Sequence, residues 1–232
     1  MITKLKEYTK QKLTQRLLDN EAHVSYSQEG EDVVLRRFLD LSKPGFYVDV
    51  GAHHPVRYSN TKYYYDRGWS GINIDADPTL IDEFKTHRTR DINLISGVGD
   101  QMKQMTFYMF NHPAINTFDA KLAAQRAKLP EYEIVNKLKI KIRSLAELLE
   151  NHLPKGKDIH FMSIDVEGQD LNVLRSNNWA KYRPAYILIE CLGAVESLEA
   201  VFDNEVTGYL RGQGYQPIAK TLYTVIFGDR NV

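Results

Sequence analysis

The chain has 232 residues, of which 43% are hydrophobic and 26% are charged, which is typical of a globular domain with one sizeable core. Its 30 lysines and arginines balance 30 acidic residues, so no overall positive field attracts nucleic acid, and we expect no nucleic-acid partner. The single cysteine, Cys191, cannot form an internal disulfide. We find no signal-peptide pattern and no apolar run of about 18 residues, so we expect a cytoplasmic location without a transmembrane segment.

Residues 1–24 have the pattern of a basic amphipathic helix. Apolar residues recur at roughly helical spacing from Ile2 to Leu18, and four lysines and Arg16 lie among them. Two interpretations stay open for this segment. The helix packs on the domain or on a second copy of the chain, or it attaches to an anionic membrane surface. We assign residues 25–232 to one domain.

A short acidic segment precedes the first expected helix, which covers about residues 33–39. Ser27 is a candidate N-cap, because its hydroxyl can accept a hydrogen bond from an unpaired amide of the first turn. The carboxylates of Glu29, Glu31 and Asp32 suit the positive end of the helix dipole.

Strand and helix patterns then alternate along the chain. Strands are expected at 46–50, 71–75, 92–96, 105–110, 159–165, 185–191 and 222–228. Helices are expected at about 59–67, 78–86, 144–150, 168–176 and 196–212. This alternation predicts a mostly parallel central sheet with helices on both faces, which is a Rossmann-like α/β fold. The last two strands are candidates for a terminal antiparallel hairpin.

Residues 111–143 fit the alternation poorly. They run from polar loops into a polar, lysine-rich stretch that we interpret as helical. An insertion of this length in a compact domain is usually a lid or a binding segment.

The first two expected strands both end close to an acidic residue. The first contains Asp49 and is followed by Gly51, and the second ends in Asp75, 26 positions after Asp49. An acid at the end of the second strand binds ribose hydroxyls in nucleotide-binding sheets, although Asp77 competes for this role. No G-x-G-x-x-G follows the first strand, so we expect no pyrophosphate cradle. S-adenosylmethionine (SAM) fits, because it has an adenine, a ribose and a cationic amino-acid tail but no phosphate. We expect Asp49 to support that tail.

Small residues follow the third expected strand. Ser96, Gly97 and Val98 lie where an adenine would bind, so a backbone amide and a small side chain can contact the base edge. An ordinary glycine turn is the alternative interpretation.

Three carboxylates follow the later strands. Asp165 ends the strand expected at 159–165, Glu167 follows it, and Glu190 lies near the end of the strand expected at 185–191. Crowded carboxylates serve as a general base, as metal ligands or as acceptors for substrate hydroxyls, and the sequence leaves these roles open. A divalent ion that bridges Asp165 and Glu190 would lower the pKa of a substrate hydroxyl.

Two histidines and a tyrosine lie beside the glycine turn. His53 or His54 can accept a hydroxyl proton, because a histidine titrates near neutral pH. The ring of Tyr58 offers a stacking face for a sugar, and packing against a helix explains it equally well.

Three motifs occur in the order found in one methyltransferase family. They are Ser27-Gln28-Glu29-Gly30-Glu31-Asp32, Val48-Asp49-Val50-Gly51-Ala52 and Ile164-Asp165-Val166-Glu167-Gly168. From about residue 25 to 228 the chain resembles the FkbM-type SAM-dependent methyltransferases. It departs from them at 53–55, where members often have a small or polar residue and another glycine.

The resemblance implies a class I methyltransferase fold and methyl transfer to a hydroxyl, commonly of a sugar or a polyketide. It also implies that Asp49, Gly51 and Asp75 contact SAM, with Gln28 and Glu29 near it. We therefore expect an O-methyltransferase that acts on a sugar, a glycan precursor or a related natural product.

Residue roles follow from this expectation. The candidates that accept the proton, which we do not rank, are His53, His54, Asp165 and Glu190. The candidates that bind the acceptor are Tyr58 and Glu167. Two alternatives are a nicotinamide-dependent oxidoreductase, against which the missing glycine fingerprint argues, and a non-catalytic SAM-binding module.

Overall fold

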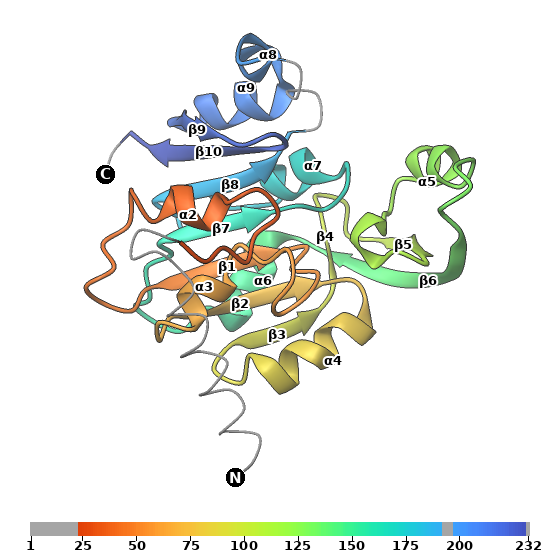
Figure 1. Cartoon of the computed structure of the whole chain (residues 1–232), viewed down its shortest axis with the longest axis horizontal. Helices are drawn as coiled ribbons and strands as arrows, with labels where there is room; N and C mark the ends of the chain where they lie inside the picture. The colour runs from red at the N-terminus through yellow and green to blue at the C-terminus, as the bar shows by residue number, and fades with distance from the viewer. Residues whose placement is uncertain (1–22, 192–196, 231–232) are drawn as a thin grey trace.

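The computed structural model describes residues 23–191 and 197–230, so the helix expected at the N-terminus lies almost wholly outside the described residues. The strands of the main sheet are β1 (Phe46–Val50), β2 (Ser70–Asp75), β3 (Ile92–Ile95), β7 (Phe161–Ile164), β8 (Tyr186–Glu190), β9 (Tyr215–Lys220) and β10 (Thr224–Asp229). Their order is β3-β2-β1-β7-β8-β10-β9 (Figure 1). The strands from β3 to β8 in this order are parallel to one another, and β10 runs antiparallel to both of its neighbours. The expected Rossmann-like, class I methyltransferase fold is confirmed.

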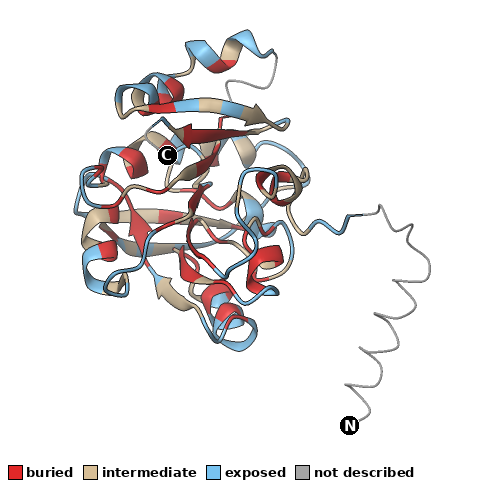
Figure 2. Ribbon diagram, turned by 90° about the vertical axis from the view of Figure 1, so that its left-hand side faces the viewer, coloured by how far each residue is buried: buried red, intermediate tan, exposed pale blue. Residues whose placement is uncertain are grey.

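Helices cover both faces of the sheet. They are α2 (Glu31–Leu35), α3 (Lys62–Tyr65), α4 (Pro78–His87), α6 (Leu145–His152), α7 (Asp170–Arg175), α8 (Glu199–Asp203) and α9 (Glu205–Gly212). Successive β1 side chains point to opposite faces. Phe46, Val48 and Val50 pack with residues of α6, α7 and α9, whereas Tyr47 packs with residues of α2 and α3. Figure 2 shows the resulting buried layer along the central strands.

A second sheet extends from the body as an arm (Figure 1). It contains β4 (Gly97–Val98), β5 (Gln104–Phe110) and β6 (Ile134–Arg143), and η1 (Pro113–Ile115) and α5 (Ala120–Arg126) lie between β5 and β6. The interpretation of the lysine-rich stretch as a helix is therefore wrong for most of its length. Apolar and lysine residues alternate with a period of two in β6, which is a strand pattern. Strand 105–110 belongs to this arm and not to the main sheet.

Three further expectations need correction. Strand β9 was not expected, and it forms the terminal hairpin with β10, whereas the strand over 185–191 lies next to that hairpin. The helix expected at 196–212 is divided, because Asn204 caps α9 by accepting from the Val206 amide. The N-cap of α2 is Gly30, although the Ser27 hydroxyl does accept a hydrogen bond from the first-turn amide of Asp32.

None of the helices in the described ranges is long and apolar enough to cross a membrane.

A buried arginine supports the loop that follows β1. The Arg88 side chain is fully buried and donates to the Pro55 carbonyl at 2.9 Å and to the Ser59 hydroxyl at 2.9 Å. It also donates to the Tyr47 hydroxyl, and the Asp91 carboxylate lies 3.7 Å from the guanidinium. Through Arg88, these contacts connect the loop after β1 to Tyr47 of β1 and to Asp91.

We predict that Arg88→Met lowers the free energy of unfolding by about 3–5 kcal/mol, because it leaves the Asp91 carboxylate buried without its cation. Urea unfolding measures this loss. The matched change at an exposed site, Arg175→Met, should alter the free energy of unfolding by less than about 0.5 kcal/mol. Equal effects of the two substitutions would contradict a supporting role for Arg88.

Candidate active site

A cleft of about 540 Å³ lies at the carboxyl ends of the parallel strands, where open α/β sheets bind ligands. Thirteen of the residues selected from the sequence line it. They are Gln28, Glu29, Asp49, Gly51, His53, Tyr58, Asp75, Ser96, Gly97, Val98, Asp165, Glu167 and Glu190. His54 does not. Residues of the arm and of the β9–β10 turn complete the wall.

Gly51 allows two backbone segments to touch at the base of the cleft. Its φ is 78°, and a Cβ at this position would lie 1.7 Å from the carbonyl oxygen of Asp165. Its amide donates to the Ile74 carbonyl at 2.9 Å. The glycine is therefore required by a protein contact, whether or not a ligand also approaches it.

Asp75 faces the cleft with its carboxylate held by the backbone. One oxygen accepts from the His53 amide at 2.9 Å, and the other accepts from the Asp77 amide at 2.8 Å. Each oxygen keeps a free lone pair for a hydroxyl donor. Burial raises the pKa of Asp75 to about 7. Asp77 instead caps α4 by accepting from Thr79, so the two acids have different positions.

Asp49 and Glu29 approach the cleft from two sides. Asp49 is buried and accepts from the Thr61 hydroxyl at 3.0 Å, and burial raises its pKa to about 6. The Glu29 carboxylate accepts from the Tyr223 amide at 3.0 Å, which attaches the segment before α2 to the β9–β10 turn. Gln28 lines the cleft beside it.

Small residues form the wall at β4. The Ser96 hydroxyl donates to the Gly97 carbonyl at 2.9 Å. A Cβ on Gly97 would lie 2.4 Å from the Ile142 side chain and 2.9 Å from the Phe118 ring. A larger residue at position 97 would therefore require the ends of the Ile142 and Phe118 side chains to move. Val98 continues the wall.

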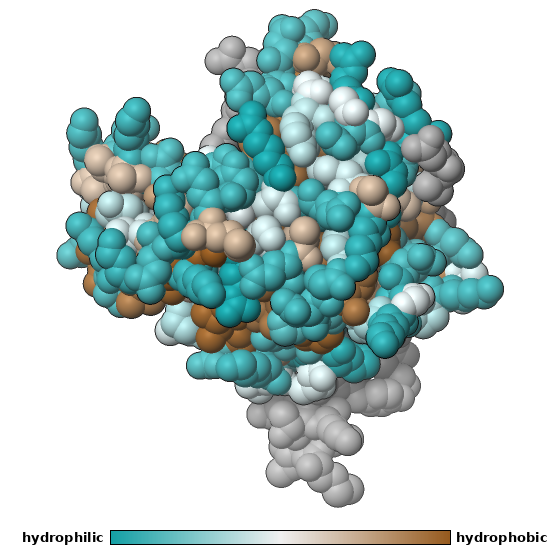
Figure 3. All heavy atoms as spheres, turned by 180° about the vertical axis from the view of Figure 1, so that it is seen from behind, coloured by the Kyte–Doolittle hydropathy of each residue, from teal (hydrophilic) through white to brown (hydrophobic). Residues whose placement is uncertain are grey.

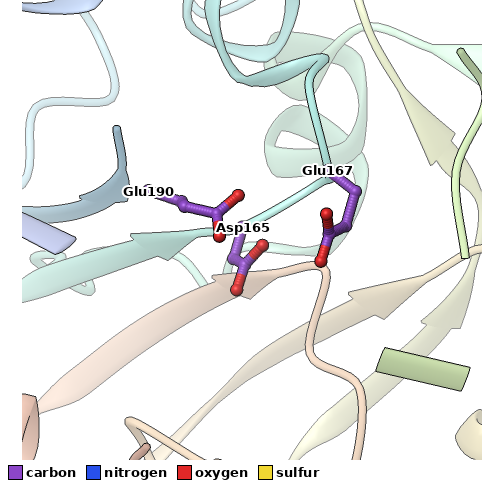
Figure 4. Close-up of side chains that lie close together, drawn as sticks. All are labelled: Asp165, Glu167 and Glu190. Carbon is purple, nitrogen blue, oxygen red and sulfur yellow. The ribbon is translucent and has the colours of Figure 1, made fainter. Parts of the chain in front are cut away.

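Asp165, Glu167 and Glu190 form an acidic cluster in which one oxygen from each residue lies within 4.8 Å of the others (Figure 4). Glu167 forms an ion pair with Arg126 of α5. Neither the Asp165 nor the Glu190 carboxylate forms a hydrogen bond with a described residue, and Oε2 of Glu190 is buried without a partner.

Burial and mutual repulsion raise the pKa values of these carboxyls. Burial, followed by the charges of Glu167 and Asp170, raises the pKa of Glu190 to about 8. Asp165 is open to the cleft on one side and surrounded by protein on the others. Burial, followed by the Glu190 charge, raises its pKa well above the usual value. The cluster therefore retains a proton at neutral pH.

The structure separates the two histidines. His53 lines the cleft, and Nδ1 of its ring is buried without a hydrogen-bond partner in the described part of the chain. Burial lowers its pKa to about 4, so the ring is neutral, and it stacks on Tyr58 with the centroids 6.2 Å apart. His54 accepts from the amides of Val56 and Arg57 through Nδ1, and its Nε2 lies 3.2 Å from Glu83.

Some residues that line the cleft were not selected from the sequence. The arm contributes Arg126, Phe118 and Tyr132, and the β9–β10 turn contributes Tyr223. The length of the insertion indicated a binding segment, but no motif marked these positions. The second sheet had to be known before they could be placed.

Comparisons with known proteins support the assignment of a family. A family model described as the methyltransferase FkbM domain matches residues 49–217. No curated protein was found to match the chain.

Two solved structures are similar at low identity. Precorrin-6y C5,15-methyltransferase from Geobacter metallireducens GS-15 has 12% identity and a TM-score of 0.44, over 85% of this chain and 88% of that chain. A TehB-like SAM-dependent methyltransferase from Corynebacterium glutamicum ATCC 13032 Kitasato has 11% identity and a TM-score of 0.42, over 99% and 100%.

We predict that Gly51→Ala lowers the free energy of unfolding by about 3 kcal/mol or more, since it combines an unfavourable φ with a backbone clash. Gly156→Ala is the matched control, because Gly156 has a φ of 72° and nothing within 4 Å of a Cβ. The control should lose only about 1 kcal/mol, from backbone strain. Similar losses for both variants in urea unfolding would contradict the close contact with Asp165.

Proposed function

We propose, because the chain belongs to the FkbM methyltransferase family, that it transfers a methyl group from SAM to a hydroxyl of a sugar or glycan precursor. The observation that carries the proposal is that one cleft contains both the backbone-held carboxylate of Asp75 and the carboxylates of Asp165 and Glu190, which accept no hydrogen bond from a described residue. Bound SAM supplies an electrophilic methyl group on a sulfonium.

The lining of the cleft suits SAM. Asp75 can accept both ribose hydroxyls, residues 96–98 can contact the adenine, and Asp49, Gln28 and Glu29 lie where the amino-acid tail would be held. Seven acidic residues line the cleft. Among the described lining residues, Arg126 is the one arginine, and there is no lysine. Part of these carboxyls stay protonated at neutral pH, and those that are ionised favour a ligand with a net positive charge and repel the pyrophosphate of a nicotinamide cofactor. The lining therefore favours methyl transfer over the oxidoreductase alternative.

Asp165 and Glu190 are the proposed proton acceptors. A hydroxyl that gains a methyl group must release its proton, and a base works best when its pKa lies near the working pH. The pKa of Glu190, which burial raises to about 8, meets that condition, and burial also raises the pKa of Asp165. His53 is neutral and has a free ring nitrogen, so we assign it a hydrogen bond to the acceptor hydroxyl. The proposal gives no proton-transfer role to His54, which lies outside the cleft.

The acceptor is proposed to bind between the ring of Tyr58 and the acidic cluster. Tyr58 is 59% exposed, and both Tyr58 and His53 have a positive φ, at 54° and 53°. Non-glycine residues in this strained conformation are concentrated at functional sites. An exposed ring over a cleft with many hydrogen-bond acceptors suits a sugar, which has both apolar faces and hydroxyls.

A divalent cation is a second way in which the acidic cluster could serve the reaction. Carboxylate oxygens are the ligands that Mg²⁺ and Mn²⁺ prefer, and a cation there would act as a Lewis acid on the acceptor hydroxyl. Arg126 competes with a cation for Glu167.

We predict that Asp75→Asn weakens the binding of S-adenosylhomocysteine by about 10- to 100-fold, because it removes charged acceptors from two hydrogen bonds. Calorimetric titration measures the affinity, and Asp82→Asn on the exposed side of α4 is the control. The wild-type affinity should be highest above pH 7 and should fall below pH 7, where the Asp75 carboxyl gains a proton. The Asp75→Asn variant should lack the fall near pH 7 and keep only the one near pH 6 that protonation of Asp49 causes. Unaltered affinity in this variant would contradict the ribose assignment.

We predict that Glu190→Gln or Asp165→Asn lowers the rate of methyl transfer by about 10²- to 10⁴-fold, through loss of the proton acceptor. The affinity for S-adenosylhomocysteine should stay within about threefold in both variants, which is below 1 kcal/mol. The rate is measured as S-adenosylhomocysteine formed with an acceptor found by screening monosaccharides and nucleotide sugars. Loss of activity in EDTA that Mg²⁺ restores would assign the cluster to a cation. S-adenosylhomocysteine binding without turnover on any acceptor would favour the non-catalytic module.

A further inference from the structure

One face of the arm has an uninterrupted row of positive charge. In the antiparallel register of β5 and β6, Lys137, Lys139 and Lys141 lie opposite Tyr108, Thr106 and Gln104. Opposed residues in a sheet share a face, and alternate residues of a strand share it too. Arg143 therefore continues the row. The basic face consists of Lys137, Lys139, Lys141 and Arg143, and it is about 20 Å long at 3.4 Å per residue.

Protein acids do not neutralise the basic face. Its three lysines are exposed, and none of its four cations forms an ion pair with a residue in the described ranges. Strand β5, which supplies the opposing residues, contains no acidic residue. Lys139 donates to the Thr106 hydroxyl, and the Lys137 ammonium lies 5.4 Å from the centre of the Tyr108 ring. The whole chain has a net charge of zero, so this row is a local concentration of charge.

Exposed aliphatic side chains accompany this charge on the arm. Met102 is 70% exposed before β5, Val135 is 58% exposed near the start of β6, and Leu129 is 46% exposed in the connection between them. Seen from behind, apolar side chains gather along the lower edge of the arm and the body, among hydrophilic ones (Figure 3). The arm projects from the body, which leaves it accessible to a large flat partner (Figure 1).

We propose that the basic face binds the surface of an anionic phospholipid membrane. Lysines attract anionic headgroups, and the exposed aliphatic side chains of the arm can enter the boundary of the acyl chains. A single-stranded nucleic acid would instead need exposed aromatic rings for its bases, and Lys137 covers the Tyr108 ring. Phe107, on the opposite face of the ribbon, lines the catalytic cleft. The membrane-binding segment therefore also forms a wall of the active site.

The lysines could also protect an open strand edge, and this role has to be distinguished from membrane binding. Between residues 134 and 141, β6 pairs with β5 on one side only, and lysines on such an open edge prevent pairing with another chain. Glutamate protects an edge equally well, because it is also charged. Reversal of the charge therefore preserves protection of the edge and abolishes attraction to an anionic surface.

The test is cosedimentation of the full chain with vesicles of phosphatidylcholine alone or with 30% phosphatidylglycerol, a composition we choose for the assay. The wild type should bind only the anionic vesicles, and added NaCl should weaken the binding. Lys137→Glu/Lys139→Glu/Lys141→Glu should bind at least about 100-fold more weakly, at about fivefold for each lysine lost. The corresponding glutamine variant should show a smaller loss. Thermal unfolding checks that both variants fold like the wild type.

A matched control reverses three exposed lysines outside the arm, in Lys43→Glu/Lys155→Glu/Lys157→Glu. It should bind the vesicles like the wild type. Equal binding of the wild type to neutral and anionic vesicles, or no binding to either, would overturn the proposal. Binding that persists in the Lys137 triple variant would overturn it too and would point to the basic residues before residue 22. Lysine-dependent binding to a DNA oligonucleotide or an acidic polysaccharide, without binding to vesicles, would replace the membrane by that polymer.

Discussion

The site depends on a backbone contact between two neighbouring strand ends. Gly51 has no Cβ, and the carbonyl of Asp165 occupies the space where one would be. The loop after β1 therefore lies directly against the loop after β7. The first loop supplies the amide that orients Asp75, and the second supplies two members of the acidic cluster. A larger residue at position 51 would separate these loops, so Asp75 and the acidic cluster are positioned by the same contact.

The acids of the cleft differ in the protein donors that contact them. Asp49 has a hydroxyl donor, Asp75 has two amide donors, and Glu167 has Arg126. Asp165 and Glu190 have no such donor among the described residues, although a buried oxygen such as Oε2 of Glu190 is almost always hydrogen-bonded. The fold tolerates this unfavourable pair because the carboxyls can retain a proton. Carboxyls with a raised pKa and no protein donor are typical of catalytic sites.

The sequence predicted the centre of the fold better than its edges. Strand β1 was placed correctly, because an apolar run ending in a glycine turn has few other structures available. Strand β9 was missed, since it contains Pro217, which argues against a strand except at a sheet edge, and β9 is an edge strand. The acids of the cleft could be found because the carboxyl ends of parallel strands meet at one edge. No comparable rule distinguishes two adjacent histidines. The conformation of the turn places His53, and not His54, in the lining of the cleft. Arg126 could not be predicted, because its place depends on how the arm folds back.

Titration of the purified wild-type chain with S-adenosylhomocysteine, and in parallel with NAD⁺, tests the central claim most directly. An acid-rich cleft with no pyrophosphate cradle should bind the first ligand with micromolar affinity and the second not at all, and one calorimetric experiment measures both. Binding of NAD⁺ alone would contradict the methyltransferase assignment while leaving the fold intact. Binding of neither ligand would contradict the claim that this cleft is a formed SAM site.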